Sequence, residues 1–181
     1  MTQAAALSTT ARLLLNMSER TTGLAAGLMQ GINPSIAASK PSIDGKVVDC
    51  NHATFIIGHL AIYPAKIMGA LGVELGESAV PASYDELFEA GLECKHDPDC
   101  TIYPAFGEVV AHFQRAHGVV HAQIAKLDDE TLTGAIGGSS RAAEFFVTRD
   151  VMSMFMLHDH YMFHLGQLST WRRCMGLGSV M

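Results

Sequence analysis

The chain has 181 residues, 49% of them hydrophobic and 17% charged, so it can bury one core of ordinary size and is not disordered. A net charge of −6 without any run of Lys and Arg argues against nucleic-acid binding, which needs a basic patch. The sequence shows no signal-peptide pattern and no apolar stretch of about 18 residues, and its four cysteines lack a disulfide-framework spacing. We therefore expect a single domain, residues 1–181, that is cytoplasmic and has no membrane segment.

The first predicted helix runs from about Ser8 to Met29. Apolar residues recur through it at roughly helical spacing, and Ser8 or Thr9 is suited to the N-cap position. A Ser-, Pro- and Gly-rich stretch, residues 31–45, follows it and predicts a long connection.

A second helix is expected over residues 51–71, and Pro64 inside it could kink it because the ring removes one amide hydrogen. Further on, Ser83 and Glu86 have the spacing of a capping box. This pattern predicts a short helix that ends near Gly91.

A third long helix is expected from about Pro104, a residue suited to the first turn, to Leu127. A fourth runs from about Phe146 to Met175, with Gly176 as the residue after its C-cap. No sustained alternation predicts a strand. The sequence therefore predicts an all-α four-helix bundle with a long connection and a short extra helix.

Nine histidines are unusual for this length, and their spacing is informative. His160 and His164 lie one helical turn apart and can chelate one ion, whereas His158 should point elsewhere. Two half-buried histidines that only pack on a bundle face would have the same spacing. His117 and His121 repeat it, and they could equally face solvent.

The loop from Cys94 to Cys100 holds two thiols around His96. Structural zinc sites usually pair two such knuckles, and the sequence has no second one. Free cysteines, or one local disulfide formed on oxidation, are therefore favoured over a zinc site.

The segment from His160 to Leu168, HYMFHLGQL, resembles the HxxxHxGQ signature of the DinB-like superfamily, and Gly58-His59-Leu60 resembles the GHL segment of that family. The resemblance extends over nearly the whole chain, although only these two segments are specific. It implies a four-helix bundle with one divalent metal held by His59, His160 and His164. Taken alone, His59 among apolar neighbours would be interpreted as a core histidine.

Three imidazoles leave coordination positions open, as a catalytic site requires, and imidazole suits Zn, Ni or Fe. The resemblance implies a metal-dependent enzyme on a small molecule, either a transferase using a low-molecular-weight thiol or a hydrolase. A non-catalytic metal- or ligand-binding stress protein is the alternative, and a scaffold with packing histidines is a third. Neither nucleic acid nor membrane is an expected partner, and a homodimer is plausible.

Further residues are candidates for the surroundings of the metal. Gln167 could hydrogen-bond a ligand imidazole or only pack beside Gly166. Tyr63 and Tyr161 could offer hydroxyl groups, but aromatic residues on a bundle helix more often fill the core. Cys50 is a weak candidate for a thiol near the site.

Overall fold

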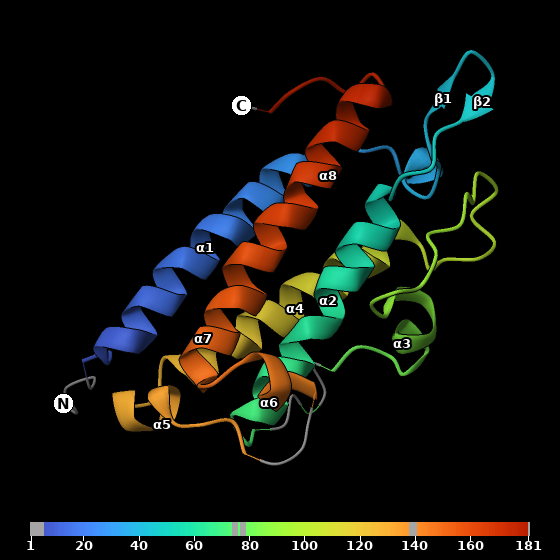
Figure 1. The fold of residues 1–181 in the computed structure, drawn as a ribbon. Coiled ribbons are helices and arrows are strands. Elements are labelled where there is room, and N and C mark those ends of the chain that lie inside the picture. Colours follow the sequence, from blue (N-terminus) through green and yellow to red (C-terminus); the bar gives the residue numbers. More distant parts are fainter. Residues whose placement is uncertain (1–5, 74–75, 77–78, 138–140, 181) are drawn as a thin grey trace.

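The structure, a computed structural model, describes residues 6–73, 76, 79–137 and 141–180. It is mostly helical, and four long helical segments pack side by side along the molecule (Figure 1). These segments are α1 (Thr9–Met29), α2 (Ala53–Ala70), α4 (Phe106–Ile124) and the combined α7 and α8. The predicted all-α bundle with a long connection after the first helix is confirmed.

Two predicted helix ends have the expected local chemistry. The Ser8 hydroxyl caps α1 and accepts a hydrogen bond from the Ala11 amide at 3.2 Å. At the other end of the chain, Gly176 has a φ of +77°, and the amide of Leu177 donates to the carbonyl of Arg172 at 2.9 Å. This is a Schellman ending, in which glycine takes the left-handed position without strain.

The last long helix contains an irregularity just before the histidine pair. Helix α7 (Arg149–Met154) passes into a π-helical turn (Phe155–Asp159) and then into α8 (His160–Cys174). The extra residue of a π turn shifts the helical phase, so it sets which face of α8 the histidines occupy. The predicted start near Phe146 was slightly early, because the N-cap is Thr148.

Two further predicted starts were wrong in detail. Helix α3 (Ser83–Phe88) is the expected short helix, but Ser83 lies inside it, and its N-cap, Ala82, makes no side-chain capping bond. Helix α4 begins at Phe106 after the N-cap Ala105, so Pro104 precedes the helix. In both cases the sequence has residues typical of a helix start. The first helical residue differs because the preceding loop determines where the backbone becomes helical.

Several short elements were not predicted. Two short helices, α5 (Asp129–Thr133) and α6 (Arg141–Phe145), lie before α7. The long connection contains a 3₁₀ turn (Pro34–Ile36) and a small antiparallel hairpin, β1 (Ser42–Ile43) with β2 (Lys46–Val47). The hairpin turns at Asp44 and Gly45, both with positive φ, and two-residue strands are too short to show an alternating pattern.

Helix α2 is the centre of the bundle and is buried on nearly all sides. Its N-cap is His52, whose Nδ1 accepts a hydrogen bond from the Phe55 amide, and the helix continues past Pro64. By length and composition alone it could also cross a membrane, but 78% of that window is buried inside the bundle, as in the core helix of a soluble protein. The expectation of no membrane partner stays a prediction.

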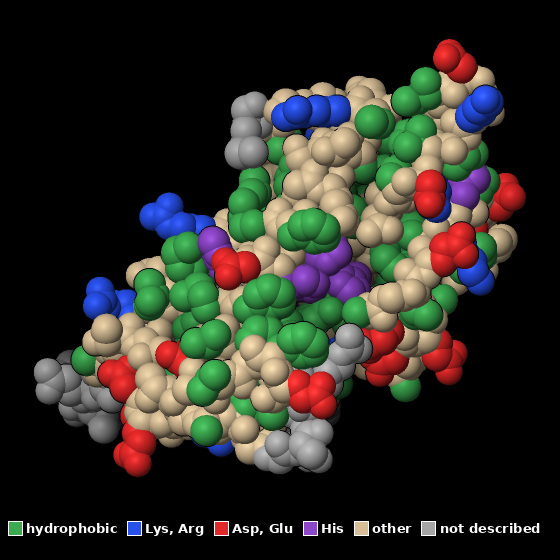
Figure 2. Space-filling view, in the orientation of Figure 1, with side chains coloured by type: hydrophobic (Ala, Val, Ile, Leu, Met, Phe, Trp, Pro, Cys, Tyr) green, Lys and Arg blue, Asp and Glu red, His purple; other side chains and the backbone are tan. Residues whose placement is uncertain are grey.

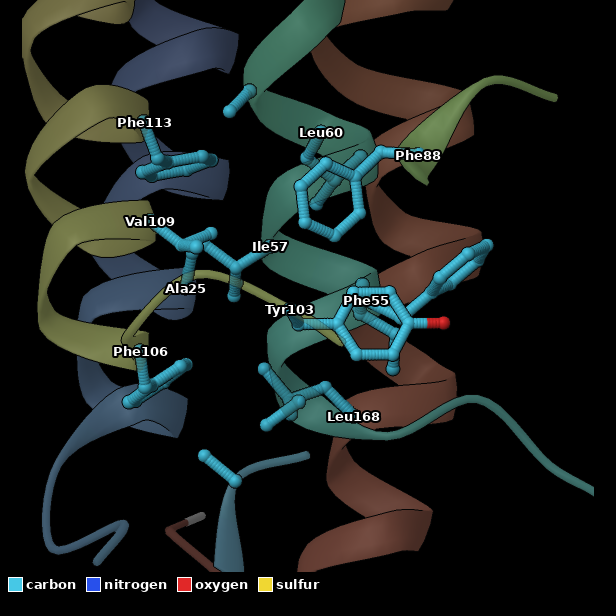
Figure 3. Packing of buried hydrophobic residues seen from close by; sticks show 14 of the residues in the cluster. Ala25, Phe55, Ile57, Leu60, Phe88, Tyr103, Phe106, Val109, Phe113 and Leu168 are labelled. Atoms are coloured by element: carbon cyan, nitrogen blue, oxygen red, sulfur yellow. The ribbon is translucent and has the colours of Figure 1, made fainter. Parts of the chain in front are cut away.

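The core joins all four long helices around α2. Figure 3 shows Ile57 of α2 directed toward Val109 of α4 and Ala25 of α1, with the rings of Phe88 and Phe55 away from these two residues. At one end of the bundle, the buried Arg172 side chain donates to the carbonyl of Leu28 at 2.7 Å. This bond ties α8 to the end of α1 and holds the C-terminal part of α8 in register with the rest of the bundle.

Candidate metal centre

Three histidines from two helices meet in one buried group. His59 comes from the middle of α2, and His160 and His164 come from the first turns of α8. One ring nitrogen from each lies within 4.8 Å of the other two. Figure 2 shows histidine side chains reaching the surface near the centre of one face, among hydrophobic side chains, so the group is accessible from outside.

The ring of His59 is oriented by a backbone carbonyl. Its Nδ1 lies 2.7 Å from the carbonyl oxygen of Phe88, and because that oxygen can only accept, Nδ1 carries the proton. The Nε2 lone pair then faces the other two histidines. Gly58 makes this contact possible, because a Cβ at Gly58 would lie 2.5 Å from the Phe88 ring.

The ring of His164 is oriented by a side-chain amide. Its Nδ1 donates to Oε1 of Gln167 at 3.0 Å, and the same oxygen accepts from Nδ2 of Asn51 at 3.2 Å. This arrangement leaves the Nε2 lone pair of His164 facing the group. The predicted hydrogen bond between Gln167 and a ligand imidazole is confirmed, and a bond of this kind strengthens a metal ligand by fixing its tautomer.

The third ring, that of His160, is placed by packing. It lies between Tyr63, with ring centroids 4.4 Å apart, and Phe155, at 5.9 Å. Its Nδ1 is buried and has no hydrogen-bond partner among the described residues.

The three Nε2 atoms have the arrangement that one metal ion requires. His160 Nε2 lies 3.0 Å from that of His164 and 3.2 Å from that of His59. Nitrogens at about 2.0–2.1 Å from one tetrahedral ion lie about 3.3 Å apart. A single proton on His160 could satisfy only one of the two facing lone pairs, so a cation fits this donor set better than any set of neutral tautomers.

Burial keeps these imidazoles uncharged. Removal from water is the main cause that lowers the pKa of His164 to about 4 and that of His160 to about 3, and the neighbouring histidines lower both further. Burial also lowers the pKa of His59. Neutral imidazole is the form that binds metals, so the group needs no deprotonation near pH 7.

His117, His121 and His158 have hydrogen-bond partners outside the group. His158 bonds to Asp159 outside the group, as its spacing predicted. His117 is buried and bonds to the hydroxyl of Tyr161, while Nε2 of His121 bonds to Ser18 at 2.6 Å. The HxxxH spacing of His117 and His121 therefore supports packing between helices.

The cysteine-containing loop forms no metal group among the described residues. All four cysteines are free, Cys94 being buried and Cys100 exposed, and Nδ1 of His96 accepts from the Lys40 amide. Cys50 lines a pocket of about 670 Å³ that Gln167 also lines, so it lies close to the surroundings of His164 without joining the group.

Two of the contacts that orient the imidazoles were not predicted. A backbone carbonyl such as that of Phe88 leaves no signal in a sequence, and for Asn51 the sequence indicates only the start of the second predicted helix. One signal was present for Phe88: a glycine inside a very apolar helix, Gly58, indicates that something packs closely on it.

A scan against models of known protein families finds no match to this chain, and a search of curated proteins finds none either. The protein is therefore characterised by its own fold and site. It is a mostly helical protein with a buried group of three histidines, His59, His160 and His164, that could hold a metal ion.

Proposed function

We propose that this protein is a DinB-like metalloenzyme in which His59, His160 and His164 hold one divalent ion, Zn, Ni or Fe. The observation that carries the proposal is the convergence of three Nε2 atoms, two of them with lone pairs turned inward by Phe88 and Gln167. Such orientation is expected of metal ligands and is not needed for core packing.

The proposed reaction takes place on a small molecule, by transfer of a low-molecular-weight thiol or by hydrolysis. Three protein ligands leave at least one position of the ion for substrate. A divalent ion bound there would supply Lewis acidity, which lowers the pKa of a thiol or water and polarises an electrophile. His160 is half-buried, and the aromatic rings of Tyr63 and Phe155 pack beside it.

Metal analysis tests the site. The purified chain should carry close to one equivalent of a transition metal, and His164→Ala should lose it. His158→Ala is the matched control, because His158 lies on the same helical segment and outside the group, and it should keep the ion. Equal metal content in both variants, or no metal uptake by the unaltered protein, would overturn the proposal.

Activity assays then distinguish a thiol transferase, a hydrolase and a non-catalytic metal-binding protein. The metal-loaded protein should consume an electrophile in the presence of cellular thiols, or hydrolyse small esters and amides without them, and His164→Ala should do neither. Stoichiometric metal with no turnover across both panels would instead favour the non-catalytic metal-binding protein. The cytoplasmic location and the homodimer are further proposals, and light scattering on the purified chain tests the dimer.

A further inference from the structure

A pocket of about 900 Å³ lies next to the histidine group. Two of its walls, Tyr63 and Phe155, are the aromatic residues that pack on His160. The histidines do not line the pocket themselves, so these two rings separate its interior from the imidazoles. A volume of this size is typical of sites for small organic ligands.

The lining of the pocket is mainly apolar, with a few charged groups. The apolar side chains of the pocket come from α2, from α6 and the loops that flank it, and from α7 with the π-helical turn that follows. They include Ile136, Phe145, Phe146, Met152, Phe155 and Met156. Aromatic and methionine side chains adapt to an apolar ligand body of varied shape. The ligand should therefore carry a substantial apolar part.

Three charged side chains line the same pocket: Lys66, Glu89 and Arg149. Lys66 and Glu89 form an ion pair at 2.5 Å and so neutralise each other. Arg149 forms no ion pair with any described residue, and only one hydrogen bond of its guanidinium is found, from Nη1 to the carbonyl of Thr131 at 3.1 Å. Its Nε is buried without a partner among the described residues.

A half-buried guanidinium that forms no ion pair within the described part of the chain, in a mainly apolar pocket, is suited to an anionic group. Arginine presents five N–H donors and pairs with carboxylates in a fixed geometry, and the apolar surroundings strengthen the attraction. Arg149 and His160 are eleven residues apart on one helical segment, which is about 16 Å along the axis. The charged end of a ligand at Arg149 would thus place the other end near the histidines.

From this geometry we infer that the pocket binds an amphipathic carboxylate, with its carboxylate at Arg149 and its apolar body directed toward Tyr63 and Phe155. The inference deepens the proposed function by naming its substrate class. Its relevance to catalysis rests on that function, whereas the binding itself requires no metal.

Calorimetric titration of the whole chain tests the inference, with decanoate and its uncharged counterpart decanamide as probes. The titrations are done in EDTA, in which no ion can hold the carboxylate, and are repeated on the metal-loaded protein and on His164→Ala. The unaltered protein should bind decanoate at least tenfold more tightly than decanamide. Arg149→Gln should reduce this preference to less than threefold, whereas Arg149→Lys should keep most of it and Arg173→Gln, an exposed arginine, all of it.

A second variant tests the pocket without touching the charge. Gly69 lines the pocket within α2, and a Cβ added there meets nothing within 4 Å. Gly69→Leu should fold normally and weaken both probes at least fivefold, while the equally open helical glycine in Gly118→Leu should weaken neither.

Equal binding of both probes, or a full preference retained in Arg149→Gln, would overturn the assignment of Arg149. Decanoate binding that appears only with metal and disappears in His164→Ala would also overturn it, because the ion would then be the carboxylate site. Failure of the proposed function is a separate result, since it is decided by metal content and by turnover, and the titrations in EDTA measure neither.

Discussion

The Nδ1–H of His59 donates a 2.7 Å hydrogen bond to the carbonyl of Phe88, 29 residues further along the chain. This bond fixes the tautomer of the histidine and joins α3 to the centre of α2. It exists because Gly58 leaves room for the buried Phe88 ring. The position of this candidate metal centre thus depends on a glycine that makes no contact with a ligand of its own.

The first prediction concerns Gly58→Ala. The added methyl group would meet the Phe88 ring at 2.5 Å, so the ring and its carbonyl must move. Overpacking of this kind costs about 1–3 kcal/mol, and the loss of the His59 bond should weaken metal binding at least tenfold. Urea unfolding and metal titration measure the two effects. Gly118→Ala, with open space around the added carbon, should gain about 0.5–1 kcal/mol and bind metal normally.

The second prediction concerns Gln167→Leu. The side chain keeps a similar size but can no longer accept from Nδ1 of His164 or from Asn51. Loss of such a partner typically costs 10–100-fold in metal affinity. Competition with a chromophoric chelator measures the affinity, and Gln123→Leu on α4 is the control. Unchanged affinity in Gln167→Leu would show that packing alone orients His164.

The third prediction concerns Tyr161, whose hydroxyl points into the core and donates to the carbonyl of Leu60 at 3.0 Å besides contacting His117. Tyr161→Phe leaves these buried groups without a partner and should lower the free energy of unfolding by about 1–3 kcal/mol. Metal affinity should stay within twofold, because the hydroxyl lies outside the histidine group. A large loss of metal with unchanged stability would contradict this role in the core.

The fourth prediction is a loss of stability in acid that involves His52. Burial lowers the pKa of His52 to about 4, although the hydrogen bond to the Lys95 carbonyl raises it. In the neutral ring Nδ1 accepts from the Phe55 amide, and this bond is lost when Nδ1 is protonated. The folded-state pKa lies below the unfolded value of about 6.5, so the unfolded chain binds the proton first. The stability that neutral His52 contributes to the fold is fully present above about pH 6.5 and is lost as the pH falls toward 4.

Urea unfolding in EDTA at pH 7 and pH 4.5 measures this effect. The unaltered chain should lose about 2–3 kcal/mol more than His52→Asn over this range, since asparagine does not titrate there. His117, with its pKa also lowered to about 4 by burial, adds to the acid loss in both proteins and cancels in the comparison. Equal losses would show that His52 is not buried in the neutral form.

The sequence by itself determined the features that depend on neighbours along the chain. Helical spacing predicted the four long segments, and the residues at Ser8 and Gly176 marked two of their ends correctly. The same spacing placed His160 and His164 on one face of α8. These are local properties, because a helix repeats every 3.6 residues and its caps bond within one turn.

Local spacing did not decide which histidines would form the site. His117 and His121 have the same separation as His160 and His164, yet they bond to Tyr161 and Ser18. The resemblance of the His59 segment to a known family, rather than spacing, supplied the third histidine. The packing of α2 against α8 brings it to the other two.

Only the tertiary structure decided how the ring of His59 is oriented and what holds the partner of His164 in place. The partners of His59 and His164 are the carbonyl of Phe88 and the amide of Gln167, and the second is itself held by Asn51, 116 residues away. The bond between His164 and Gln167 lies within α8 and could be anticipated from the sequence, whereas the contacts of Phe88 and Asn51 depend on how α2, α3 and α8 pack. The histidine pair and its neighbour Gln167 were therefore visible in the sequence, whereas the orientation of His59 comes from a contact between distant segments.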